Sequence, residues 1–238
     1  MSRILMVLSA ADTLALADGT SHPTGYWAEE VSESHRVLTA AGAVVDVATP
    51  GAGLPVLDPI SLDGRGGVDP ADGIRYAADL GGIAGLESPL DLGGIDLADY
   101  DAILLPGGHA PMADLAHDAD LGALLGEAVN AGIVVAALCH GLAGLLSATS
   151  PAGDFLFAGR ALTAFSDEEE NTGGLGEAAP YLLAQRLSER GAEVDVASPW
   201  SSHVVVDQRG DSILVTGQNP QSTTATAQRL LEVLARTV

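Results

Sequence analysis

Apolar residues along the chain fall into short runs, and stretches with helical spacing separate these runs. Six runs have the composition of β-strands, at 3–8, 43–50, 100–108, 132–141, 192–199 and 212–217. The centres of the first, third and fourth runs are almost continuously apolar, which is typical of strands buried on both faces of a parallel sheet. A shorter run, "RALTAF" at 160–165, also has strand character.

Helical patterns connect these runs. They lie at 25–42, 118–132, 177–191 and 219–238, and the first three end at Gly42, Gly132 and Gly191. Glycine is the common residue just beyond the C-terminus of a helix. Alternating strands and helices predict an α/β fold with a doubly wound, mostly parallel, flavodoxin-like sheet that carries helices on both faces.

Residues 50–98 depart from this alternation. The segment is rich in Gly, Pro and Asp, and only 69–79 has the pattern of a short helix. Irregular segments of this length within a compact domain are usually functional or poorly ordered. Because the segment carries no charge block or low-complexity repeat that would indicate an independent linker, we expect an inserted loop and helix region within a single domain that spans 1–238.

Charge and composition exclude several classes of function. The formal net charge is −22, and all ten basic residues are arginine. We therefore expect no nucleic-acid partner, since such binding needs a basic patch, and no lysine Schiff base. No apolar run is long enough to cross a membrane, and the first residues resemble a strand rather than a signal peptide. A single cysteine fits a reducing cytoplasm.

Motifs for bound cofactors are also missing from the sequence. There is no GxxxxGK[ST] and no GxGxxG after a strand, and no Cys, His or carboxylate residues have zinc-site spacing. We expect neither a nucleotide cofactor nor a metal.

Cys139 is the only cysteine, and it ends the apolar run "GIVVAAL". The strand, the sequence Cys-His-Gly and the helical "LAGLLSA" together have the pattern of a nucleophile elbow. Gly141 would let such a turn pack tightly, and the following helix is expected to lower the pKa of the thiol. The alternative is a buried, inert cysteine. The Cys-His-Gly context favours a nucleophile.

Two glycines follow another predicted strand in "LLPGGHAPMADL". The backbone N–H groups of Gly107 and Gly108, with the N–H of His140, are candidate donors for an oxyanion. His109 is a candidate for the wall of the substrate site. The same pattern is also compatible with an ordinary turn between a strand and a helix.

Acidic residues occur in two further stretches that should lie at the carboxyl end of the sheet. In "TGYWAEEV", Trp27 is expected to contact substrate, and an acid such as Glu30 could donate and retrieve a proton beside the thiol. In "SDEEE", one carboxylate of Asp167, Glu168, Glu169 and Glu170 could orient His140. The alternative for the first stretch is a pair of acids that the dipole favours at the start of a helix, and for the second it is a solvated acidic loop.

Taken in order, these stretches resemble the ThiJ/PfpI superfamily, which has the class I glutamine-amidotransferase-like fold. The segments that carry the resemblance are "TGYWAEEV", "PGAGLPVLDPIS", "LLPGGHAPMADL", "AALCHG" and "TGQNPQS". They are similar to one branch in particular, the heat-shock-chaperone-like, glutathione-independent glyoxalases (D-lactate dehydratase type).

The resemblance implies a mechanism and a set of roles. Cys139 would attack the aldehyde of methylglyoxal or a related 2-oxoaldehyde to give a hemithioacetal. His140 and Glu30 would move a proton between adjacent carbons, Glu170 would hold His140, and hydrolysis would release a 2-hydroxy acid. No metal or glutathione would be required, and a cytoplasmic homodimer is expected.

Two other functions remain open on the sequence. A stress-response holdase would need an exposed apolar patch, of which the composition gives little sign. A cysteine hydrolase or amidase of the same fold would use the same thiol on a different substrate.

Overall fold

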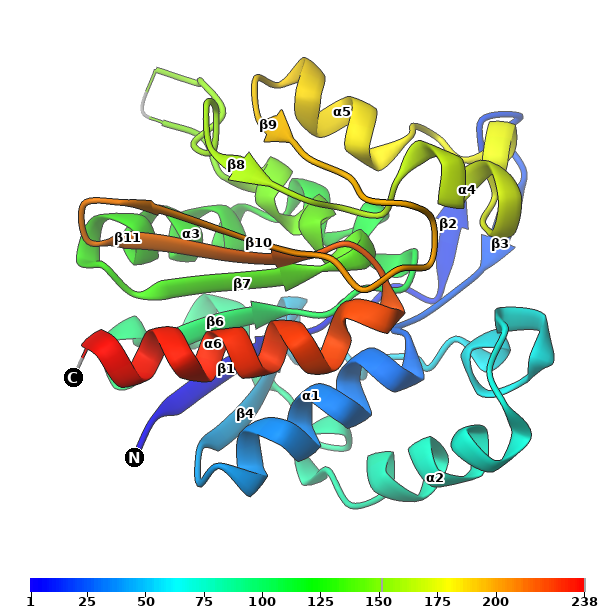
Figure 1. The fold of residues 1–238 in the computed structure, drawn as a ribbon, viewed down its shortest axis with the longest axis horizontal. Helices are drawn as coiled ribbons and strands as arrows, with labels where there is room; N and C mark the ends of the chain where they lie inside the picture. Colours follow the sequence, from blue (N-terminus) through cyan, green and yellow to red (C-terminus); the bar gives the residue numbers. More distant parts are fainter. Residues whose placement is uncertain (151, 238) are drawn as a thin grey trace.

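The computed structural model describes residues 1–150 and 152–237, which form a seven-stranded sheet between layers of helices (Figure 1). The strand order is β10-β11-β7-β6-β1-β4-β5, and every neighbouring pair is parallel except β10 and β11. The strands are β1 (Arg3–Val7), β4 (Val44–Thr49), β5 (Leu90–Asp91), β6 (Ala102–Leu105), β7 (Val134–Leu138), β10 (Val204–Arg209) and β11 (Ser212–Gly217).

The order of the five main parallel strands identifies the fold class. Numbered along the chain, β4-β1-β6-β7-β11 reads 2-1-3-4-5, which is the flavodoxin-like arrangement. The predicted doubly wound, mostly parallel sheet is therefore confirmed. In such sheets, ligands bind beyond the carboxyl ends of the strands where the strand order reverses, here between β1 and β6.

Helices cover both faces of the sheet. On one face lie α1 (Ala28–Ala40), α2 (Pro70–Leu80) and α6 (Thr223–Thr237), and on the other lie α3 (Ala119–Ala131) and α5 (Leu183–Glu189) (Figure 1). Successive side chains of β1 point to opposite faces, so Leu5 packs toward α3 and Met6 toward α1 and α6. This two-sided burial explains the continuous apolar runs.

Three predicted elements need correction. The run 192–199 forms only β9 (Glu193–Val194), which pairs with β8 (Ala161–Leu162) outside the main sheet. The strand at that edge of the main sheet is β10 instead, and no predicted strand corresponds to it. The helix predicted at 177–191 begins only at Leu183, because Pro180 interrupts the pattern. The segment after the elbow, Cys139–Ser147, is a 3-10 helix rather than an α-helix.

The insertion at 50–98 forms a series of 3-10 turns, the predicted short helix as α2, and the edge strand β5. A small hairpin of β2 (Thr13–Ala15) and β3 (Ser21–Pro23), also missed, follows β1. Among the helices described, none is long and apolar enough to span a membrane.

Candidate active site

Cys139 sits on a strained turn at the end of β7. Its φ angle is +55°, a left-handed conformation that side-chain-bearing residues rarely adopt. A Cβ on Gly141 would overlap the carbonyl oxygen of Leu105, so only glycine fits there. The turn holds the thiol at the carboxyl end of the sheet, as the nucleophile-elbow hypothesis requires.

Glu30 lies fully buried on α1 beside this thiol. Its Oε2 accepts a hydrogen bond of 2.6 Å from the N–H of Gly107, whereas its Oε1 has no hydrogen-bond partner among the described residues. Burial raises the pKa of Glu30 to about 8. The carboxyl group is therefore mostly protonated at neutral pH and can act as an acid.

The thiol of Cys139 differs from the sequence-based expectation. Burial and the adjacent Glu30 carboxyl raise its pKa well above the ordinary value, and the nearby His140 N–H offsets this only in part. The expected lowering by a following helix is wrong, because burial outweighs the short 3-10 segment that replaces that helix. The thiol is protonated at rest, so it needs a base at the moment of attack.

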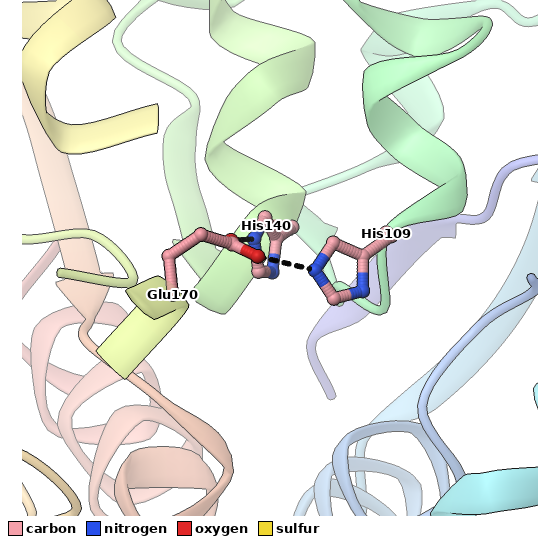
Figure 2. A group of neighbouring side chains, drawn as sticks. All are labelled: His109, His140 and Glu170. Carbon is pink, nitrogen blue, oxygen red and sulfur yellow. Dashed lines mark hydrogen bonds and ion pairs between the residues drawn. The ribbon is translucent and has the colours of Figure 1, made fainter. Parts of the chain in front are cut away.

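His140 provides that base. Its Nδ1 lies 3.5 Å from the Cys139 sulfur. Its Nε2 lies 2.6 Å from Glu170 Oε2 (Figure 2). Although burial opposes ionisation, the two histidines hold the pKa of Glu170 well below its usual range. An ionised carboxylate only accepts hydrogen bonds, so Nε2 must carry the imidazole proton. Burial lowers the pKa of His140. The Nδ1 lone pair of the neutral ring therefore faces the thiol.

His109 shares the carboxylate of Glu170. Its Nε2 lies 3.1 Å from Oε1, and its ring centre is 4.1 Å from that of His140. The N–H of Leu175 donates to the same oxygen at 2.6 Å. His109 thus touches the base-orienting group directly, a role that the sequence analysis did not foresee.

Glu169 and Glu170 face different surroundings. Glu169 Oε2 accepts hydrogen bonds from Ser166 and Gln218, and its Oε1 accepts them from Asn219 and the Trp200 N–H. Glu170 alone reaches His140. The structure places the residue that the resemblance implied, and not its neighbour, beside the histidine.

The two glycines after β6 have separate functions. The N–H of Gly107 is already donated to Glu30, so it is not available to an oxyanion. A Cβ on Gly107 would also lie 2.7 Å from the backbone nitrogen of His140. The N–H of Gly108 donates to none of the residues that the structure describes, and Gly108 adopts a φ of +88°. Gly108 and His140 therefore remain the candidate oxyanion donors.

A cavity of about 640 Å³ opens over the thiol. Cys139, His140, His109 and Gly108 line it, together with Trp27. The indole Nε1 of Trp27 and the Nδ1 of His109 are both buried without a hydrogen-bond partner in the described part of the chain. Such atoms at a cavity are ready to bond a ligand.

Several cavity residues were missed from the sequence. Phe165 and Trp200 form an aromatic wall, with ring centres 5.6 Å apart, and Phe165 lies 4.5 Å from the His140 ring. Arg65 and Tyr76 line the cavity from the 50–98 segment. The composition of that segment indicated function in general, but no motif marked individual residues.

Known proteins are similar to this chain in sequence and fold. A glutathione-independent glyoxalase, hsp3101, of Schizosaccharomyces pombe is 34% identical over 147 residues, which cover 58% of this chain and 59% of that protein. The matched part is thus less than two thirds of that relative. The glutathione-independent glyoxalase HSP31 of Saccharomyces cerevisiae is 28% identical over 98% of both chains. The Francisella tularensis Rapid Encystment Protein superposes with a TM-score of 0.86 at 27% identity, covering 98% of this chain and 99% of that chain.

A family model also matches most of the chain. The model of the DJ-1/PfpI family covers residues 23–232, which include the elbow, the glycine pair after β6 and both buried acids. This range is most of the chain, and it agrees with the resemblance seen in the sequence motifs. The chain belongs to the DJ-1/PfpI family.

Proposed function

We propose that the protein is a cysteine-dependent, glutathione-independent glyoxalase that converts methylglyoxal or a related 2-oxoaldehyde to a 2-hydroxy acid. One observation carries this proposal: a thiol that lines a cavity has a protonated acid, Glu30, and a neutral base, His140, as neighbours. Isomerisation of a 2-oxoaldehyde needs a nucleophile and both proton carriers. The glyoxalase names of the yeast relatives support the same activity.

In the first step, His140 Nδ1 takes the thiol proton while the Cys139 sulfur bonds to the aldehyde carbon. The N–H groups of Gly108 and His140 stabilise the oxygen that becomes negative. The imidazolium then returns its proton to this oxygen, which completes a hemithioacetal. Because Glu170 holds Nε2, the ring stays oriented throughout.

In the second step, a proton moves between the two former carbonyl carbons. His140 removes the proton from the carbon bonded to sulfur, while Glu30 donates one to the neighbouring carbonyl oxygen, giving an enediol. His140 then gives its proton to that neighbouring carbon, and the hydroxyl on the carbon bonded to sulfur gives its proton to Glu30, which leaves a thioester. Water then hydrolyses this thioester, so that methylglyoxal and water together yield lactate.

The test is an assay of purified full-length protein with methylglyoxal and without glutathione. We expect consumption of the dicarbonyl matched by formation of lactate, and no turnover by Cys139→Ala. Glu168→Gln, at an exposed position on α4 (Asp167–Gly173), is the matched control and should retain the wild-type rate. A wild-type rate no higher than that of Cys139→Ala would refute the proposal.

The same thiol, base and oxyanion donors also fit a cysteine amidase. The acid at position 30 favours the glyoxalase, because an amidase needs no second proton carrier beside the sulfur in addition to its histidine. Hydrolysis of simple amides without turnover of dicarbonyls would select the amidase.

A further inference from the structure

Three metal-ligating side chains converge beside the cavity, and the two histidines among them line it. His109, His140 and Glu170 each offer one ligand atom, and these atoms all lie within 4.8 Å of one another (Figure 2). They belong to the loop after β6, the elbow after β7 and the helix α4. All three residues are buried, with exposed fractions of 7%, 1% and 2%. Folding therefore brings the three groups together.

The hydrogen bonds within this cluster show how an ion would be held. Each imidazole directs its Nε2 at the same carboxylate, at 3.1 Å for His109 and 2.6 Å for His140. Two N–H protons, one on the Nε2 of each histidine, thus lie between these nitrogens and the Glu170 carboxylate. In a tetrahedral zinc site, with bonds of about 2.0–2.1 Å, ligand atoms are separated by roughly 3.4 Å. Small rotations of the side chains would reach this geometry.

We infer that the Nε2 atoms of His109 and His140 and the carboxylate of Glu170 form a binding site for Zn²⁺. Two imidazoles and one carboxylate are a ligand set that zinc accepts, whereas Mg²⁺ and Ca²⁺ prefer oxygen alone. The ionised Glu170 supplies a compensating charge. The cavity, which His109 and His140 line, adjoins the site. Three protein ligands would leave the fourth position of a tetrahedral zinc ion to water.

Zinc at this position has a direct consequence for His140. The metal takes the Nε2 lone pair, so the proton leaves Nε2, and a neutral metal-bound ring must carry its proton on Nδ1. The atom that faces the Cys139 sulfur is then a donor and no longer a base. This consequence rests on the proposed function, and it makes zinc a reversible inhibitor. The binding site itself does not depend on the reaction.

A competing site is the thiol, because cysteine alone also attracts zinc. Nδ1 and Nε2 lie on opposite sides of the imidazole ring, and the sulfur is near Nδ1. A zinc ion on Nε2 therefore lies across the ring from Cys139. The two sites predict opposite behaviour for Cys139→Ala, which retains the proposed site and loses the competing one.

The test is calorimetric titration of metal-free, full-length protein with Zn²⁺. We expect one zinc per chain, with unchanged affinity in Cys139→Ala and at least tenfold weaker binding in His109→Gln and Glu170→Gln. The matched control is His203→Gln, since His203 Nε2 also lies 3.1 Å from a carboxylate, Asp195, but in an exposed pair without a third ligand. This variant should bind zinc as the wild type does.

A second test measures the visible absorption spectrum of Co²⁺ added to the Cys139→Ala protein. It does not depend on the folding of a variant in which a proposed metal ligand is replaced. Visible bands of Co²⁺ in a site of low coordination number support the proposal, and a spectrum equal to that of free Co²⁺ refutes it. Unchanged zinc affinity in folded His109→Gln also refutes it, as does loss of binding in Cys139→Ala. If zinc binds as expected but methylglyoxal is not turned over, the proposed function fails and the binding site stands.

Discussion

Two buried polar clusters lie side by side at the start of α4, and they differ in how completely their hydrogen bonds are satisfied. Around Glu169, both carboxylate oxygens are saturated by five donors, which come from Ser166, Trp200, Gln218 and Asn219. This cluster ties α4 to the segments that flank β10 and β11. It has no capacity left for a ligand.

The cluster around the thiol is incomplete. Four buried side-chain polar atoms lack a partner in the described part of the molecule, and three of them belong here: Trp27 Nε1, Glu30 Oε1 and His109 Nδ1. An unsatisfied buried polar group costs free energy, so its persistence needs an explanation such as ligand binding. Buried polar groups whose hydrogen bonds are all formed thus stabilise the fold, whereas buried polar atoms without a hydrogen-bond partner indicate the groups that bind substrate.

The largest effect should come from Cys139→Ala. Loss of the nucleophile removes covalent catalysis, and we expect kcat/KM for methylglyoxal to fall by about 10³-fold or more. The thermal midpoint should change little, because the hydrogen bonds of the sulfur, to His140 and Glu30, are weak thiol bonds. A large loss of stability with residual turnover would contradict the assignment of Cys139 to the incomplete cluster.

Glu169 and Glu170 are adjacent on α4 but belong to different clusters, so variants of the two residues distinguish the clusters most clearly. Glu170→Gln should lower kcat by about 10²–10⁴-fold, because an amide can turn a donor toward His140 and disturb its tautomer.

Glu169→Gln should instead reduce the free energy of unfolding by about 1–3 kcal/mol, because an NH₂ group replaces an acceptor in a saturated site. Its kcat should remain near that of the wild type. Steady-state kinetics and urea unfolding of both variants test these two expectations. A loss of stability in Glu170→Gln together with a loss of kcat in Glu169→Gln would contradict the functions assigned to the two clusters.

The neighbouring acids of α1 provide the next test. Glu30→Gln should lower kcat about 10²-fold, because the amide cannot donate and retrieve a proton. Glu29→Gln is the matched control, since Glu29 lines the cavity but touches neither the thiol nor His140. It should change kcat by no more than about twofold. Equal losses in the two variants would argue against proton transfer by Glu30.

Stability should depend on pH through the same residue. The pKa of Glu30 is about 8 in the folded protein against an ordinary value of 4.5, so the folded state keeps a proton that the unfolded chain has released. The free energy of unfolding should therefore fall as pH rises through this window. Burial also raises the pKa of Glu29, to about 7.

Of the two carboxyl groups, Glu30 has the higher pKa and extends the decline further, toward pH 8. The raised pKa of Cys139 adds to the decline only as pH approaches the ordinary thiol value of 9.0. In Glu30→Gln the decline should end near pH 7, as measured by urea unfolding across the range. A decline that continues to pH 8 in this variant would show that another group carries it.

The smallest effect is expected for Trp27→Phe. The change keeps an aromatic wall and removes the unpaired Nε1, so stability should be unchanged or slightly higher. We expect KM to rise severalfold with kcat nearly constant, as for a lost substrate contact. An unchanged KM would show that Trp27 Nε1 does not bind substrate.

The sequence alone predicted the central fold because continuous apolar runs report burial on two faces. It failed at 192–199, where alternating valines have the pattern of a strand although the residues lie outside the main sheet. The β10–β11 hairpin was missed because its outer strand is partly exposed. The single domain and homodimerisation stay predictions.

The site was predicted only in part. Cys139, His140, Glu30 and Glu170 were accessible from motifs, since each lies next to a predicted strand end or helix start. The raised pKa of the thiol was not accessible, because it depends on burial and on a carboxyl group 109 residues away in the chain. The contact between His109 and Glu170 likewise depends on packing across 61 residues.

The contact of Gly141 with the carbonyl of Leu105 limits how proteins built on this plan can diversify. Since no side chain fits at that position, the turn that presents the thiol cannot be altered without moving β6 as well. Evolution of new substrate preference is thus directed away from the elbow and toward the 50–98 segment, whose residues reach the cavity but carry no part of the sheet's centre.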